Sequence, residues 1–123
     1  NKFKIMKANE LRLNNIVNNK YDELKYNLVT GVDSDNIYFN NITFDYVQHE
    51  DVEPIPLTDE WLVKFGFERN TTSWTKLFKY SFGLKIKTPH KNRLWYNGLD
   101  LKHVHQLQNL YFALTGEELI IKI

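Results

Sequence analysis

The sequence predicts an α+β protein in which a small SH3-like β subdomain precedes an antiparallel α-β-β-β-α-β subdomain. The first half consists of short segments rich in strand-forming residues, whereas both segments with a helical period lie in the second half. No connection is long enough for repeated βαβ crossovers, so we expect the strands to pair antiparallel. The length of 123 residues favours one compact unit.

Residues 1–53 are expected to form the SH3-like β subdomain. A single helical turn over Ala8–Arg12 leads into it. The predicted strands are Leu24–Val32, Ile37–Phe39 and Ile42–Val47. Asp33–Asn36 and Asn40-Asn41 are predicted turns, because their side chains bond the local backbone. Three or four short strands without a covering helix are typical of a small barrel.

A proline-containing connector, residues 54–57, is expected to separate the two subdomains. Pro54 and Pro56 fix φ and remove two amide donors, and they push the residues before them towards extended conformations. The segment is therefore predicted to be a stiff link between the two halves.

The second subdomain, residues 58–123, is predicted to begin with a short helix. Thr58 suits the N-cap and Gly66 the C-terminal stop. The apolar stripe of this helix comprises Trp61, Leu62 and Phe65. Three strands are predicted to follow, Ser73–Tyr80, Phe82–Thr88 and Arg93–Tyr96, with turns at Pro89–Asn92 and Asn97-Gly98.

The longest helix is predicted over His103–Thr115, with Gly116 ending it. Its apolar residues recur on one face, and they are Val104, Leu107, Leu110, Tyr111 and Leu114. Leu119–Ile123 is predicted to be a closing strand.

Charge is distributed unevenly along the chain. Residues 1–57 contain 6 Lys or Arg and 9 Asp or Glu, a balance of −3, whereas residues 58–123 contain 10 and 6, a balance of +4. Such an asymmetry between halves can mark an interaction face.

The strongest functional signal is a run without acidic residues from Arg69 to Leu99, in which basic and aromatic residues alternate. The candidate binding residues within it are Lys76, Lys79, Lys85, Lys87, Lys91, Arg93, Trp95 and Tyr96. On strands, such residues form a basic, partly aromatic face that suits phosphates and stacked bases, or an acidic protein surface. A solvated outer face with lysines protecting an edge strand is the alternative.

The sequence gives no support to enzymatic or metal chemistry, and we expect neither a catalytic activity nor a cofactor. Cysteine is absent, which excludes a thiol nucleophile and a cysteine zinc site. His103 and His105 lack the i, i+4 spacing of helical zinc ligands, so a hydrogen-bonding role near the helix start is expected. The segment from Asp33 begins like a calcium loop but has Tyr38 and Phe44 where glycine and glutamate are needed. No nucleophile-elbow, P-loop or dinucleotide motif occurs.

No apolar run approaches the ~20 residues of a membrane helix, so no membrane contact is expected. The predicted location is the cytoplasm of a bacterial host, which the absence of cysteine also fits.

Three segments together resemble a group of small proteins from Bacteroidota phages and mobile elements. They are KANELRLNNIV at Lys7–Val17, IPLTDEWLVKFGF at Ile55–Phe67 and VHQLQNLYFALTGEEL at Val104–Leu119, roughly a third of the chain. The resembling proteins often carry Gly-Asn in place of Asn14-Asn15. Their motifs carry no known chemistry, so the resemblance assigns no residue a role.

What the resemblance implies is a class of function. Small non-enzymatic phage proteins often bind host defence or replication machinery, and the leading expectation is an inhibitor of a host RNA-guided nuclease, similar in kind to anti-CRISPR proteins. Its partner would be the effector nuclease or its guide-RNA complex. The alternative is a module that binds RNA or DNA directly and serves replication or regulation. Either function rests on analogy.

Overall fold

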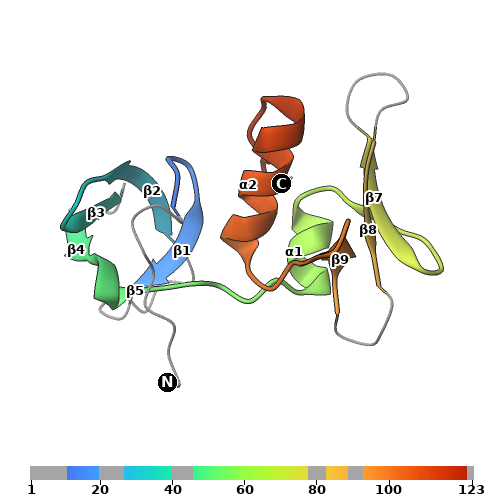
Figure 1. The fold of residues 1–123 in the computed structure, drawn as a ribbon, viewed down its shortest axis with the longest axis horizontal. Coiled ribbons are helices and arrows are strands. Elements are labelled where there is room, and N and C mark those ends of the chain that lie inside the picture. Colours follow the sequence, from blue (N-terminus) through green and yellow to red (C-terminus); the bar gives the residue numbers. More distant parts are fainter. Residues whose placement is uncertain (1–10, 20–26, 40–45, 78–82, 89–92, 122–123) are drawn as a thin grey trace. The chain divides into compact units, whose positions relative to one another are not determined.

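The computed structural model describes residues 11–19, 27–39, 46–77, 83–88 and 93–121 of the chain. The protein is α+β, with two antiparallel five-stranded sheets and few helices (Figure 1). It divides into two compact units, Asn1–Ile55 and Pro56–Ile123, and the division falls within the proline-containing segment 54–57. Each unit is described by itself.

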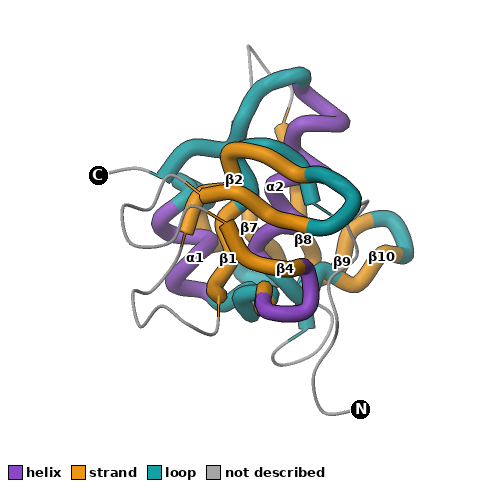
Figure 2. Tube along the Cα trace, turned by 90° about the vertical axis from the view of Figure 1, so that its left-hand side faces the viewer, coloured by secondary structure: helices purple, strands orange, loops and turns teal. Residues whose placement is uncertain are grey.

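The first unit contains one sheet with the strand order β4-β3-β2-β1-β5. Its strands are β1 (Ile16–Asn19), β2 (Asn27–Val32), β3 (Asn36–Phe39), β4 (Tyr46–Gln48) and β5 (Val52–Glu53). The first four form a meander of antiparallel neighbours. A 3-10 turn, η2 (His49–Asp51), then redirects the chain so that β5 pairs with β1 (Figure 2, purple beside β4).

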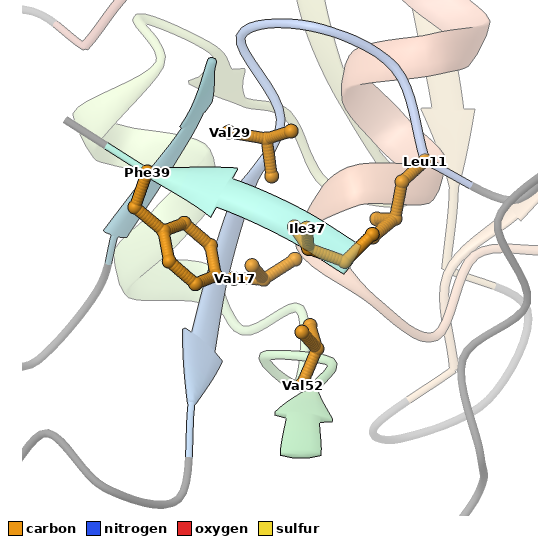
Figure 3. Close-up of a cluster of buried hydrophobic side chains, with 6 residues drawn as sticks. All are labelled: Leu11, Val17, Val29, Ile37, Phe39 and Val52. Carbon is orange, nitrogen blue, oxygen red and sulfur yellow. The ribbon is translucent and has the colours of Figure 1, made fainter. Parts of the chain in front are cut away.

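Alternating burial along the strands builds the core of this unit. In β3, Ile37 and Phe39 are buried and Tyr38 between them is half-buried, as expected for a strand with one face inward. A bulge in β2 between Val29 and Gly31 keeps that alternation in register with β3. The core side chains converge between the strands (Figure 3), and they are Leu11, Val17, Val29, Ile37, Phe39 and Val52.

A tight turn formed by polar side chains leads into β1. The Asn15 amide donates to the Arg12 carbonyl (3.1 Å), and the Arg12 amide donates back to Asn15 Oδ1 (2.7 Å). Asn14 between them has φ 74°, a left-handed conformation that asparagine and glycine tolerate best. Asn15 is fully buried, so the Asn14-Asn15 pair is part of the scaffold of this unit.

The predicted turn at Asp33–Asn36 is confirmed, and its first side chain holds it closed. Asp33 Oδ1 accepts hydrogen bonds from the amides of Asp35 (2.9 Å) and Asn36 (2.8 Å). Tyr38 donates its hydroxyl to Asp33 Oδ2 (2.6 Å). These hydrogen bonds, that of Tyr38 foremost, hold the pKa of Asp33 below its usual value.

The strand predictions for this unit are correct in type where they can be compared, and incomplete. The segments Leu24–Tyr26 and Ile42–Asp45 of two predicted strands lie outside the described residues, as does most of the predicted helical turn. Leu11 and Arg12, at the end of that turn, are not helical. The prediction missed β1 and β5, which pair with each other across a long sequence separation, Asn18 opposite Glu53.

The second unit begins with α1 (Asp59–Lys64), for which Thr58 is the N-cap residue as predicted. Gly66 ends it with φ 86°. The Phe67 amide donates to the Leu62 carbonyl and the Gly66 amide to the Val63 carbonyl, both at 2.9 Å. This pair of bonds is the Schellman motif, which needs a left-handed residue at the position of Gly66.

The second sheet has the strand order β10-β9-β8-β7-β6. Its strands are β6 (Glu68–Arg69), β7 (Ser73–Leu77), β8 (Gly83–Lys87), β9 (Trp95–Tyr96) and β10 (Leu99–Asp100). The sequence predicted the three inner strands, although β9 begins at Trp95 rather than Arg93, and residues 78–80, Phe82 and the predicted turn at Pro89–Asn92 lie outside the described residues. It missed both outer strands, each of which is too short to show an alternating pattern. The Asn97-Gly98 turn between β9 and β10 is confirmed, with φ 45° and 85°.

The unit ends with α2 (Val104–Thr115), which ends as predicted and begins one residue later than predicted. His103 is the N-cap residue, and Gln106 Oε1 accepts from the amides of Lys102 (2.9 Å) and His103 (3.0 Å). Two residues of the predicted apolar stripe are not buried: Leu110 is half-buried and Leu114 is exposed. Their positions drift away from the row of Val104, Leu107 and Tyr111, so His105 and Gln108 are buried instead.

The predicted closing strand at Leu119–Ile123 is wrong for residues 119–121, which form no strand. Leu119 is buried, whereas Ile120 is 72% exposed. Neither pairs with a strand within the part of the chain that the structure describes. A single buried side chain therefore anchors this segment in place of a ladder. Residues 122 and 123 lie outside the described residues.

Candidate binding surface on the second sheet

The candidate surface is built on β8, which alternates strictly between the two sides of its sheet. Leu84 and Ile86 are buried, at 2% and 0% exposure, whereas Gly83, Lys85 and Lys87 are exposed. Figure 1 shows α1 and α2 on one side of β7 and β8. The two lysines therefore lie on the side of the sheet that the helices leave uncovered.

Strand pairing determines which other residues share this side, because directly opposed residues of an antiparallel pair point the same way. One row across the sheet joins Glu68, Thr75 and Lys85. A second row joins Ser73, Lys87, Trp95 and Asp100. Leu77 opposes Gly83 on the same side. Ser73 in the second row is buried. We call this surface the open face, and its exposed or half-buried residues are Glu68, Thr75, Leu77, Gly83, Lys85, Lys87, Trp95 and Asp100.

A cation–aromatic pair lies at the centre of the open face. Lys87 Nζ lies 5.6 Å from the centroid of the Trp95 ring, within the range of a cation–π interaction. Trp95 is half-buried, whereas Trp61 and Trp74 are buried. The open face thus carries the one half-exposed tryptophan among the three of the chain.

A salt bridge borders the pair on the β10 side. Arg93 Nε lies 2.8 Å from Asp100 Oδ1, with both side chains partly exposed. The hydrogen bond from Arg93 is the main reason that the pKa of Asp100 lies below its usual value. Much of the positive charge of Arg93 is therefore offset within the protein, which leaves Lys85 and Lys87 as the principal cations of the open face.

The structure brings some predicted site residues together and separates others. Lys85, Lys87 and Trp95 share the open face, and Arg93 joins it through Asp100. Lys76 opposes the buried Leu84, so it points to the other side of the sheet. Tyr96 follows Trp95 on the same strand and also points to that other side. Lys79 and Lys91 lie outside the described residues.

The sequence prediction missed the acidic members of the open face. Glu68 and Asp100 immediately flank the acid-free run, and β6 and β10 bring both of them back beside it. The signal for Asp100 was present, because an Asn97-Gly98 hairpin turn places Asp100 opposite Trp95. No comparable signal indicated the strand that carries Glu68.

Arg69, at the start of the acid-free run, lies on the other side of the sheet, where it contacts Trp74 and Thr88. Its guanidinium carbon lies 5.5 Å from the Trp74 ring, and its Nη1 donates to Thr88 Oγ1 (3.3 Å). Thr88 Oγ1 in turn donates to the Thr72 carbonyl (3.0 Å). The side chain therefore crosses β7 and links the edge strand to the end of β8.

The structure offers no metal site in its described ranges: no group of three or more His, Asp or Glu side chains comes together there. The rings of His103 and His105 stack, with centroids 5.8 Å apart and planes at 14°. Within the same described part of the chain, no helix is long and apolar enough to cross a membrane.

No protein-family model, curated protein or solved structure matches this chain. Its function is therefore inferred from the open face and from the motifs of the sequence.

Proposed function

We propose that this chain is a non-enzymatic binding protein that holds a protein partner on the open face. The observation that carries the proposal is the composition of that face, in which Lys85 and Lys87 lie beside Trp95 and Leu77 and between two acidic residues. Leu77 is 73% exposed on a side of the sheet that the helices leave uncovered. A half-exposed tryptophan is typical of protein interfaces, in which aromatic residues are enriched.

The partner we propose is a host RNA-guided nuclease or its guide-RNA complex, as for anti-CRISPR proteins. This step is supported by the resemblance of the Lys7–Val17, Ile55–Phe67 and Val104–Leu119 motifs to proteins of Bacteroidota phages and mobile elements. Electrostatic complementarity between a basic stripe and an acidic partner surface favours fast and specific association.

Direct binding of RNA or DNA is the second candidate, and the Lys87–Trp95 pair favours it. A lysine beside a half-exposed indole could hold a phosphate while a base stacks on the ring. Leu77, 73% exposed on the same face, argues against it, because an apolar contact suits a protein side chain better than a phosphate. The protein-binding proposal therefore ranks first.

We further propose that the first unit is an SH3-like barrel. Its meander of four strands, the 3-10 turn η2 after β4 and the return of β5 to β1 support this assignment. Residues 1–57 have a net charge of −3, whereas residues 58–123, which include the open face, have a net charge of +4.

The test is capture of the tagged protein from its bacterial host, with and without nuclease treatment of the lysate, followed by a cleavage assay on the captured nuclease. A stoichiometric complex that survives the treatment and loses cleavage activity supports the proposal. Lys87→Glu should weaken inhibition, whereas Lys64→Glu, a matched charge reversal on α1, should not. Partners that vanish with the nucleic acid would support the second candidate, and binding by that route should fall steeply with salt.

A further inference from the structure

We infer that the open face recognises an extended acidic segment of a protein, with acidic residues two and four positions from an apolar residue. The inference rests on the proposed function, and it names the chemistry of the partner. It follows from the order of residues along β8 and from the charges on both sides of that strand.

The spacing of the two lysines selects an extended chain. Lys85 and Lys87 are two residues apart on one strand, so their Cα atoms are separated by about 6.7 Å along β8. A peptide in extended conformation repeats the side chains of one face with the same period. Two acidic residues at positions i and i+2 of such a peptide can therefore meet both ammonium groups in one register. A helical segment would not, since its i and i+2 side chains diverge.

The end of the stripe supplies the apolar contact. Gly83 precedes Lys85 by two residues and lies on the same side of the sheet, but it has no side chain. Leu77 lies opposite Gly83 on β7. A Cβ placed on Gly83 would lie 3.1 Å from Leu77 Cδ2, so the leucine side chain lies against this position. Along β8 the face therefore offers an apolar contact, then a cation, then a second cation. This order gives the segment its apolar and acidic positions.

The flanking acids lie on the two outer strands of the sheet, so the positive charge of the open face is concentrated on β8. Glu68 and Asp100 each lie two strands away from β8, on opposite sides, which corresponds to about 10 Å. That separation exceeds the Debye length of ~8 Å at physiological salt, so the field of these carboxylates is largely screened over β8, where Lys85 and Lys87 dominate. A single extended peptide fits between them. These carboxylates repel phosphates and peptide carboxylates alike, so the apolar contact at Leu77 is what favours a peptide over a polynucleotide.

Direct titration of the 15N-labelled full chain by NMR tests the inference, because the method detects weak binding and locates it. The probe is a blocked hexapeptide Leu-Thr-Glu-Thr-Glu-Thr. The first control is its isomer Leu-Thr-Glu-Glu-Thr-Thr, which has the same charge with the two carboxylates on opposite sides of an extended chain. The second control is a thymidine oligonucleotide of equal charge.

We expect the alternating peptide to shift the amides of Lys85 and Lys87 and the indole NH of Trp95, and to bind at least several-fold more tightly than the isomer. Lys85→Glu with Lys87→Glu should lower its affinity about tenfold or more, because two attractions become repulsions. Lys64→Glu should leave the affinity unchanged. Leu77→Ala should weaken the alternating peptide by severalfold and leave its charge dependence intact.

Two results would overturn the inference: equal affinity for the two isomers, or tighter binding of the oligonucleotide than of the alternating peptide. Failure of the proposed function is a separate outcome. If the protein binds the alternating peptide at this face but captures and inhibits no nuclease, the inferred recognition chemistry is supported and the proposed partner is wrong. If the protein inhibits a nuclease but does not distinguish the two peptides, the proposed partner is supported and the inferred recognition chemistry is wrong.

Discussion

Lys87 and Trp95 face each other across β8 and β9, with Lys87 Nζ 5.6 Å from the centroid of the indole ring. Trp61 and Trp74 are buried at 8% and 5% exposure, whereas Trp95 is half-buried. The part of the tryptophan emission that solvent molecules can reach therefore comes mainly from Trp95. This relationship makes the electrostatic environment of the open face measurable without a known partner.

Lys87→Glu should reverse the charge preference of tryptophan quenching. In the unmodified chain the ammonium group beside Trp95 attracts iodide and repels caesium, so iodide should quench the accessible emission more strongly. In the variant, caesium should quench the accessible emission more strongly than before, and iodide should quench it less strongly. Acrylamide, which is neutral, should quench both proteins alike and so shows that ring exposure has not changed. Equal iodide quenching in both proteins would mean that the lysine does not act on the ring.

The features of the second unit that the sequence predicted best depend on local chemistry. The bounds of α2 follow from its apolar period and from Gly116, which has φ 75° and donates to the Phe112 carbonyl (2.8 Å). The Asn97-Gly98 turn is an equally local signal. Each is determined by a few consecutive residues, so a single sequence is enough to identify it.

The features that were missed depend on pairing between distant segments. β1 and β5 are short and find each other only in the folded unit, where Asn19 opposes Val52. Lys76 and Lys85 are both basic and both lie on predicted strands, so the sequence alone does not distinguish them. The register of the β7–β8 hairpin places them on opposite sides, with Lys76 opposite Leu84. The open face could therefore be predicted as basic and aromatic, but its members and its acidic borders required the register.

Arg69→Ala should destabilise the second unit by about 1–2.5 kcal/mol. The change removes the cation over Trp74, worth ~0.5–1 kcal/mol, and the hydrogen bond to Thr88, worth ~0.5–1.5 kcal/mol. Urea unfolding followed by tryptophan emission reports on this unit alone, since all three tryptophans belong to it. Lys85→Ala is the matched control and should change stability by less than about 0.5 kcal/mol. An Arg69 variant as stable as this control would show that the side chain does not tie the strands together.

Gly66→Ala should cost about 1–2 kcal/mol, because a side chain disfavours the left-handed conformation with φ 86° that the Schellman motif requires. Gly83→Ala is a suitable comparison, because Gly83 lies within β8, where the tightest contact of the added Cβ is with Leu77 Cδ2 (3.1 Å), part of a side chain exposed enough to move, and the Lys76 carbonyl oxygen lies at 3.4 Å. It should change stability by no more than about 0.5 kcal/mol. The same urea titration measures both, and equal losses would indicate that the end of α1 tolerates a side chain.

Tyr111→Phe should make the second unit less sensitive to alkali. Burial of Tyr111, with a smaller contribution from Glu117, raises the pKa of the phenol above its ordinary value of 10.0. The folded state therefore favours the protonated phenol, and the stability that this supplies is complete below about pH 10 and is lost as pH rises through the raised pKa. Between about pH 8 and pH 11, the free energy of unfolding from urea titrations should fall less for Tyr111→Phe than for the unmodified chain. Lysines titrate equally in both proteins and cancel in the difference. Glu117→Gln, which removes the smaller cause alone, should give a weaker effect in the same direction, and identical pH profiles for all three proteins would show that ionisation of Tyr111 is not linked to folding.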